Sequence, residues 1–193
     1  MNLINSKSAC KTLKSGLPVI FPTDTLPAIG CLPEFSKIIY DFKKRDRNKP
    51  LILMGSEYNQ LIDFVHESAK EDYEKIALKY WPGALTIVIP CSQKKNETIT
   101  SRDFTIGLRI PNSYMAKSLM RETGPLLTSS ANISGSTGSV TVEGVALDFP
   151  SVDILGPLPW EKNSGKASTI ISWKKNRDWR VIRQGEVLVK GFN

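Results

Sequence analysis

FTIGLRI, residues 104–110, has the clearest strand pattern in the chain. Its apolar residues recur at every second position, and Thr105, Gly107 and Arg109 occupy the positions between them. A period of two is typical of a strand with one face in the core, so we expect a half-buried strand here. Arg109 then lies on the polar face, where its guanidinium needs a carboxylate, a phosphate or water; a surface ion pair would also satisfy it.

The segments on either side of this stretch alternate between short apolar runs and longer amphipathic ones. We expect strands at residues 17–21, 51–54, 84–90, 125–128, 152–155, 168–172 and 179–183. We expect helices at residues 3–15, 34–43, 57–66, 68–80, 112–122 and 141–148, and polar loops at 22–31, 91–103 and 129–139. The strands interleave with helices without a regular repeat, which predicts an α/β fold with a mixed sheet.

Length and charge narrow the class of protein. The chain has 193 residues, which favours a single domain over residues 1–193. Lys and Arg number 26 and Asp and Glu 19, giving a net charge of +7. This excess predicts an anionic partner, either nucleotide phosphates or an RNA backbone, although solubility alone would also explain it.

The cysteine count and the hydropathy bear on the compartment. Three widely spaced cysteines, Cys10, Cys31 and Cys91, fit neither a disulfide framework nor a zinc site, so we expect reduced thiols in a cytoplasmic protein. The sequence shows no secretory signal and no run of ~18 apolar residues, so we expect no association with a membrane.

A basic run, KKRDRNK at residues 43–49, follows the predicted helix 34–43. Lys43 and Arg45 would diverge on a helix, but on extended chain they point the same way. Pro50 favours extended geometry just before it, so both cations can face one anion. The alternative is a helix end whose basic residues simply favour the helix dipole.

Two hydroxyl-rich loops each follow a predicted strand end. In SSANISG, residues 129–135, Ser130 and Asn132 have the same spacing of two. In PTDT, residues 22–25, a carboxylate lies between two threonines. Small polar side chains and free backbone N–H groups beyond a strand suit phosphate or a small polar substrate; plain solvated turns are the alternative.

Several common sites are excluded. His66 is the only histidine, so neither a histidine-based metal cluster nor a Ser-His-Asp triad is credible, and we expect no protein metal site. Neither a Walker loop nor GxGxxG occurs, which excludes nucleotide binding by those routes.

Five motifs in order carry a family resemblance: FPTDTLPAIG, KKRDRNKPLILM, WPGALTIVIP, IGLRIP and LLTSSANISG. Together they resemble the YrdC/TsaC family of threonylcarbamoyl-AMP synthases in its short, single-domain form. Ser168-Thr169 and VIRQGEV, residues 181–187, resemble the closing motifs of that family. The resemblance implies a twisted mixed sheet with flanking helices around a positively charged cavity. It also implies that L-threonine, bicarbonate and ATP are joined into threonylcarbamoyl-AMP, with release of pyrophosphate.

The resemblance also implies roles for particular residues. Lys43 and Arg45 are the expected catalytic pair. ATP is expected to contact these two together with Ser130, Asn132, Ser168 and Arg183. Thr25 and Arg109 are expected to bind threonine. Mg²⁺ is expected on the triphosphate, held mainly by phosphate oxygens and water.

The same resemblance implies partner proteins and leaves two alternative functions open. Threonylcarbamoyl-transferase proteins would act downstream, on a tRNA adenosine. A non-enzymatic module that binds tRNA or double-stranded RNA is the second hypothesis, because charge and resemblance both allow it. A related carbamoyl-adenylate enzyme is the third.

The sequence departs from the family pattern at three places. Leu26-Pro27-Ala28 stands where the family often has Val-Tyr-Gly, so the aromatic expected in the amino-acid pocket is missing. Asp46 replaces a frequent proline, and Met54 stands where long relatives have histidine.

Overall fold

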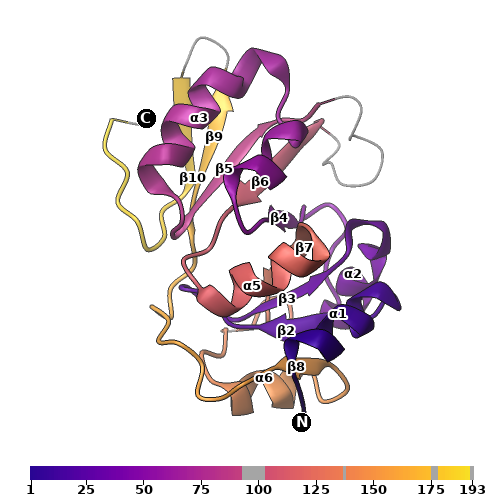
Figure 1. Ribbon diagram of the computed structural model, residues 1–193. Helices are drawn as coiled ribbons and strands as arrows, with labels where there is room; N and C mark the ends of the chain where they lie inside the picture. The colour runs from indigo at the N-terminus through magenta and orange to yellow at the C-terminus, as the bar shows by residue number, and fades with distance from the viewer. Residues whose placement is uncertain (93–102, 137, 175–177, 192–193) are drawn as a thin grey trace.

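The computed structural model describes residues 1–92, 103–136, 138–174 and 178–191. Within these residues the strands form one ten-stranded sheet with the order β1-β8-β2-β3-β7-β4-β6-β5-β9-β10 (Figure 1). The strands are β1 (Asn2–Ile4), β2 (Val19–Phe21), β3 (Ala28–Cys31), β4 (Ile52–Met54), β5 (Leu85–Pro90), β6 (Thr105–Arg109), β7 (Leu126–Ser130), β8 (Asp153–Leu155), β9 (Thr169–Lys174) and β10 (Asp178–Arg183). Parallel and antiparallel pairs both occur, so the predicted mixed α/β fold is confirmed.

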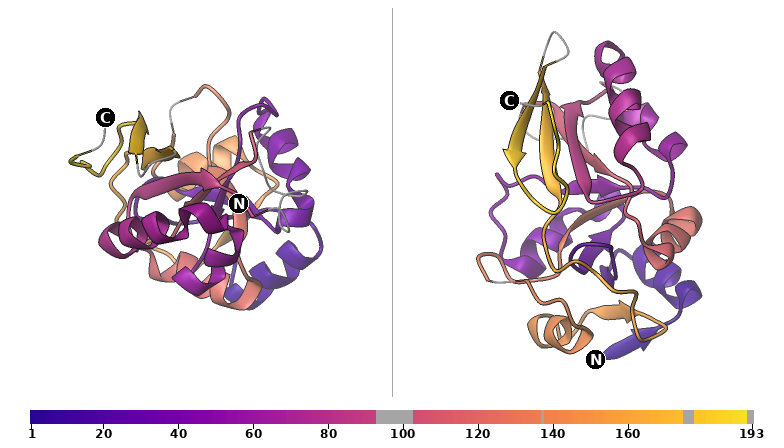
Figure 2. Two further views of the ribbon diagram at one scale, coloured as in Figure 1. Left: turned by 90° about the horizontal axis from the view of Figure 1, so that it is seen from above. Right: turned by 90° about the vertical axis from the view of Figure 1, so that its left-hand side faces the viewer.

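Five α-helices and four short 3₁₀ helices connect these strands in the described residues. The α-helices are α1 (Ser6–Lys14), α2 (Lys37–Lys43), α3 (Lys70–Tyr80), α5 (Tyr114–Thr123) and α6 (Val142–Asp148). The 3₁₀ helices are η1 (Pro33–Phe35), η2 (Tyr58–Gln60), η3 (Ile62–Phe64) and η4 (Glu67–Ala69). Helix α3 lies with β5, β9 and β10 at one end of the molecule, and α1 and α6 lie with β2 and β8 at the other (Figure 2).

Local sequence explains where the helices begin. Asn5, Ser113 and Thr141 precede α1, α5 and α6, and each side chain accepts a hydrogen bond from a first-turn backbone N–H. Such caps satisfy donors that the helix itself leaves unpaired. Helix α2 ends at Lys43, because Lys44 takes the left-handed conformation at φ 50°.

The central strands have one face in the core and one face open to a cavity. Leu53, Ile87, Leu108 and Leu127 are all buried in the larger hydrophobic cluster. The residues of the opposite face pair in one row across the sheet. This row runs Gly30–Thr128–Ile52–Gly107–Val88–Ser172. Side chains on a strand alternate between faces, so the pairing register decides which residues reach the cavity.

The structure corrects several expectations. Residues 28–31 form strand β3, whereas we expected a loop over 22–31. Residues 2–4 form the edge strand β1, so the first helix begins only at Ser6. The predicted helix at 57–66 is instead a pair of 3₁₀ turns, η2 and η3. The strand predicted at 104–110 spans Thr105–Arg109 and is not half-buried, because Gly107 and Arg109 are as buried as Ile106 and Leu108. Phe104, which we expected on the apolar face, lies outside the strand and is 66% exposed. Most of the loop predicted at 91–103 lies outside the described residues.

The cysteines are in the state that the sequence predicts. All three cysteines are free thiols, and burial raises the pKa of Cys31 to about 12. In the described residues, no helix has the length and hydrophobicity needed to cross a bilayer.

Tyr73 of α3 generates a prediction about stability. Its side chain is fully buried, and its hydroxyl has no hydrogen-bond partner among the described residues. An unsatisfied buried donor costs ~1–3 kcal/mol, so Tyr73→Phe should raise the free energy of unfolding by about 1 kcal/mol. Urea denaturation measures this. Tyr58→Phe, in a half-buried ring stacked on Tyr73 at 5.5 Å, is the matched control, and a loss of stability in Tyr73→Phe would contradict the prediction.

Candidate active site

A cavity of about 780 Å³ opens on the face of the central strands opposite the larger core. The strand residues lining it are Ala28, Ile52, Met54, Thr86, Val88, Thr105, Gly107, Arg109, Thr128, Ser130, Ile170 and Arg183, with Ser129 and Ile182 beside them. Most follow the alternation expected of one sheet face. The rest of the wall comes from Tyr40, Asp103 and the segments 25–26, 45–51 and 167–168.

The charge in this cavity is strongly positive. Arg45, Arg47, Arg109 and Arg183 line it, and Asp103 is the one acidic residue among its described lining residues. Burial lowers the pKa of Arg45, Arg109 and Arg183, and the Arg45 charge lowers that of Arg183 further. Arginine stays protonated even so, and the site therefore suits a ligand with several negative charges.

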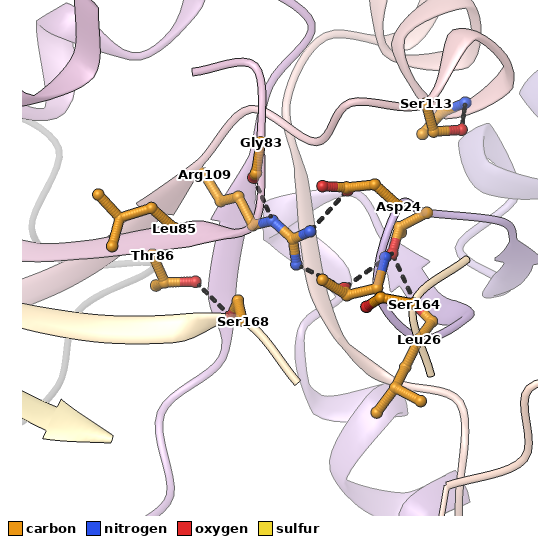
Figure 3. A network of polar contacts seen from close by, with 12 residues as sticks. Asp24, Leu26, Gly83, Leu85, Thr86, Arg109, Ser113, Ser164 and Ser168 are labelled. Atoms are coloured by element: carbon orange, nitrogen blue, oxygen red, sulfur yellow. Dashed lines mark hydrogen bonds and ion pairs between the residues drawn. The ribbon is translucent and has the colours of Figure 1, made fainter. Parts of the chain in front are cut away.

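Arg109 is held rigidly at the centre of the network in Figure 3. Its Nη2 donates to Asp24 Oδ1 at 2.6 Å, and its Nη1 donates to Thr25 Oγ1 at 2.9 Å. Its Nε donates to the Gly83 carbonyl at 3.1 Å. Arg109 and Thr25, which we expected to work together, are thus in direct contact. Asp24 neutralises a guanidinium that is only 2% exposed.

A second polar group lines the same cavity as Arg109. Thr86 and Ser168 hydroxyls are 2.9 Å apart, and Arg183 donates from Nε and Nη2 to the Ser168 carbonyl at 3.2 and 2.9 Å. The turn after Arg183 leaves no room for a side chain at Gly185, where a Cβ would overlap backbone atoms of Ala167 and Ser168. Ser168 and Arg183, far apart in sequence, are therefore fixed side by side.

Arg45 faces the cavity, but Lys43 does not. Arg45 donates from Nε to the Lys49 carbonyl at 3.2 Å and from Nη2 to the Pro50 carbonyl at 3.1 Å. Lys43 is 1% exposed and absent from the cavity wall. We expected both cations to face one anion. The left-handed Lys44 between them reverses the chain, so the two side chains point to different places.

The Lys43 ammonium holds the loop that follows β7. Its Nζ donates to the carbonyls of Ser130 and Asn132, the latter at 2.6 Å. Within the loop, Ser130 Oγ donates to Asn132 Oδ1 at 2.6 Å. The Asn132 amide donates to the carbonyls of Ile133 and Ser136 at 2.9 and 2.8 Å. Ser130 lines the cavity, whereas Asn132 braces the loop behind it.

Sequence reasoning missed several polar residues in the cavity wall. Thr86, Arg47 and Asp103 line the cavity, but we did not single them out. The alternation in ALTIVIP, residues 84–90, could have placed Thr86 on the open face. Nothing local in the sequence distinguishes Arg47 or Asp103 from ordinary surface charges. Within the described residues, no three His, Cys, Asp or Glu side chains gather as a metal site.

Comparison with known proteins identifies the family. The Sua5/YciO/YrdC family model, described as "Telomere recombination", matches residues 11–185. The chain belongs to this family. E. coli YciO superposes on the whole of this chain and on 98% of its own length, with a TM-score of 0.79 at 21% identity, a likeness of fold alone.

Relatives with closer sequences carry one functional name. The threonylcarbamoyl-AMP synthase of Buchnera aphidicola subsp. Baizongia pistaciae is 32% identical over 89% of this chain and 96% of its own length. That of Bacillus subtilis is 33% identical over 73% of this chain and 42% of its own length. P. abyssi Sua5, solved in complex with L-threonine, is 28% identical with a TM-score of 0.86. The match covers 96% of this chain but 58% of that Sua5.

Lys43 makes the stability of the fold depend on pH in a definite direction. Burial lowers its pKa from 10.5 to about 8; Arg45 adds to this effect and Asp148 opposes it. The unfolded chain therefore binds more protons than the folded one between pH 8 and 10.5. The contribution of Lys43 to the free energy of unfolding should rise with pH across this window.

Urea denaturation of the wild type and of Lys43→Met from about pH 7 to 10 measures this contribution. The stability of the wild type relative to Lys43→Met should increase with pH. Lys14→Met, which replaces an exposed lysine, controls for the change in net charge. A difference that stays constant over the range would contradict the lowered pKa of Lys43.

Proposed function

We propose that this protein is a threonylcarbamoyl-AMP synthase, which makes threonylcarbamoyl-AMP and pyrophosphate from L-threonine, bicarbonate and ATP. The observation that carries the proposal is the meeting of Arg45, Arg109 and Arg183 in one cavity. Relatives that bear this enzyme name, and a Sua5 structure with L-threonine bound, support the assignment. We further propose that residues 1–193 act as a single domain, since their described strands share one sheet.

Two groups of lining residues suit the two parts of the reaction. Arg45 and Arg183 would hold the triphosphate, with hydroxyls of Ser130 and Ser168 beside it. Thr25 and Arg109 would hold the amino acid. Lys43 and Asn132 would act on ATP indirectly, by fixing the loop that presents Ser130. This revises the expected direct role of Lys43 as one of a catalytic pair.

The chemistry follows from positioning and charge. The neutral amine of threonine attacks carbon dioxide supplied by bicarbonate and loses a proton, which forms a carbamate. A carbamate oxygen then bonds to the α-phosphorus of ATP as the bond to the bridging oxygen breaks and pyrophosphate departs. Phosphoryl-type transfers of this kind depend on alignment and on stabilising charge rather than on a protein nucleophile. Guanidinium groups near the departing pyrophosphate supply that stabilisation.

Magnesium fits this site as a companion of the triphosphate. Mg²⁺ commonly keeps several waters and binds one or two carboxylates together with substrate phosphates. Asp103 in the cavity wall is a single carboxylate of that kind. Bound there, Mg²⁺ would neutralise charge on the phosphates. Asp103 would orient its water shell.

The product is a mixed anhydride, which must be passed to an acceptor. We propose that threonylcarbamoyl-transferase proteins use it to modify tRNA in the cytoplasm. Direct contact of this chain with tRNA or double-stranded RNA is a separate property. It would show as binding that weakens steeply with salt.

The proposed activity predicts pyrophosphate release that depends on threonine. Incubation with ATP, Mg²⁺, labelled bicarbonate and L-threonine should give pyrophosphate and a labelled adenylate. Omission of threonine should abolish both products. Pyrophosphate release at the same rate without threonine, or none with it, would overturn the assignment, and RNA binding without any nucleotide chemistry would favour the non-enzymatic module.

Arg45→Ala should remove transition-state stabilisation of about 2–4 kcal/mol, by analogy with other lost oxyanion donors. This corresponds to a decrease in kcat/KM of roughly 30- to 1000-fold. Arg180→Ala is the matched control, because Arg180 is exposed on β10 and lies outside the cavity wall. Equal kcat/KM values for the two variants would show that Arg45 does not act on the reaction.

A further inference from the structure

Two threonines in the segment between β2 and β3 form a directed chain of hydrogen bonds. Thr23 and Thr25 flank Asp24 and are 2% and 3% exposed. Thr25 lines the cavity, whereas Thr23 lies behind it. A hydroxyl has one hydrogen to donate and two lone pairs to accept with, so the direction of each bond can be worked out from the partners.

The direction is fixed first at Thr23. Thr23 Oγ1 lies 2.7 Å from the Leu26 carbonyl oxygen, which can only accept, so Thr23 spends its one hydrogen there. Thr23 Oγ1 also lies 3.1 Å from Thr25 Oγ1, and in that contact Thr25 must be the donor. The backbone N–H of Thr25 donates to the same oxygen at 3.1 Å. Both lone pairs of Thr23 are therefore occupied.

The direction at Thr25 follows. Its hydrogen points to Thr23, and one of its lone pairs accepts from Arg109 Nη1 at 2.9 Å. One lone pair is left on Thr25 Oγ1, and Thr25 is one of the residues that line the cavity. Thr25 therefore offers the cavity an acceptor and no donor. Arg109 offers the opposite: three of its five N–H groups bind Asp24, Thr25 and Gly83, which leaves two further donors.

We propose that Thr23 is a positioning residue that sets the hydrogen-bond polarity of Thr25, so that Thr25 Oγ1 accepts an N–H from the amino nitrogen of the bound amino acid. This inference rests on the proposed function, which supplies the amino acid as ligand. Thr25 and Arg109 then divide the two ends of that ligand between them. The lone pair of Thr25 takes the amino group, and the free N–H groups of Arg109 take the carboxylate.

This polarity suits the reaction. The amino nitrogen must use its own lone pair to attack carbon dioxide. A neighbour that accepts an N–H leaves that lone pair available, whereas a neighbour that donates would occupy it. Thr23 has no contact with the ligand in this scheme, yet it decides which kind of neighbour Thr25 is.

The test pairs two variants with two ligands. Thr23→Val keeps the shape but frees the hydrogen of Thr25, which can then turn toward the cavity and meet the ligand N–H. Thr23→Ser keeps the hydroxyl. Calorimetry gives the Kd of L-threonine, and competition gives that of 3-hydroxybutyrate, which keeps the carboxylate and hydroxyl but lacks the amine.

Thr23→Val should raise the Kd of L-threonine about tenfold and leave the Kd of 3-hydroxybutyrate within about twofold of its wild-type value. Thr23→Ser should keep both Kd values within about twofold of those of the wild type. Equal weakening of both ligands would show a merely structural role and overturn the proposal, as would unchanged binding of L-threonine in Thr23→Val. If the wild type neither binds L-threonine nor releases pyrophosphate, the proposed function itself fails.

NMR of the wild-type protein tests the directions even if Thr23→Val does not fold. The Thr23 hydroxyl proton should lie close to Leu26, and the Thr25 hydroxyl proton should lie close to Thr23. A Thr25 hydroxyl proton found on the cavity side would overturn the assigned polarity.

Discussion

The burial of one guanidinium constrains the whole site. Arg109 extends from the middle of the sheet and is 2% exposed, so its charge must be met by fixed partners. Asp24 supplies the opposite charge, and the Gly83 carbonyl and the Thr25 hydroxyl take further N–H groups. These partners come from two separate parts of the chain, residues 24–25 and Gly83. Loss of one would leave a buried polar group unpaired, so the arrangement holds as a unit.

The two faces of the central sheet have different roles: one packs in the core and the other lines the cavity. On β4, β5, β6 and β7, alternate side chains fill the larger core, and the residues between them line the cavity. A shift of one residue in register would turn Arg109 into the core and Leu108 toward the ligand. The packing of the apolar face thus fixes the position of the polar one. Stability and function are coupled here through register, and no loop has to carry the site alone.

Much of the fold and of the candidate site can be predicted from local sequence pattern. The remaining features depend on contacts between residues that are distant in the sequence. FTIGLRI predicted its strand and the placement of Arg109 correctly, because period two is a local property. Strand β3 escaped prediction, since Pro27 and Gly30 read as turn residues and one of its two pairing partners, β7, lies far away in the sequence. The direction of Lys43 escaped it too. Its orientation depends on a left-handed Lys44, a conformation that lysine seldom adopts and the sequence does not signal.

Two like charges lie close together in the cavity, an arrangement that does not stabilise the fold. Arg45 and Arg183 are close enough that the charge of one lowers the pKa of the other, and both are partly removed from water. Like charges held together in a protein destabilise it unless something relieves them. Asp24 does so for Arg109, but the Arg45–Arg183 pair is held by backbone carbonyls, which relieve it only in part. A polyanion bound between them would supply the missing charge, so this unfavourable arrangement supports the proposal that the pair binds a triphosphate.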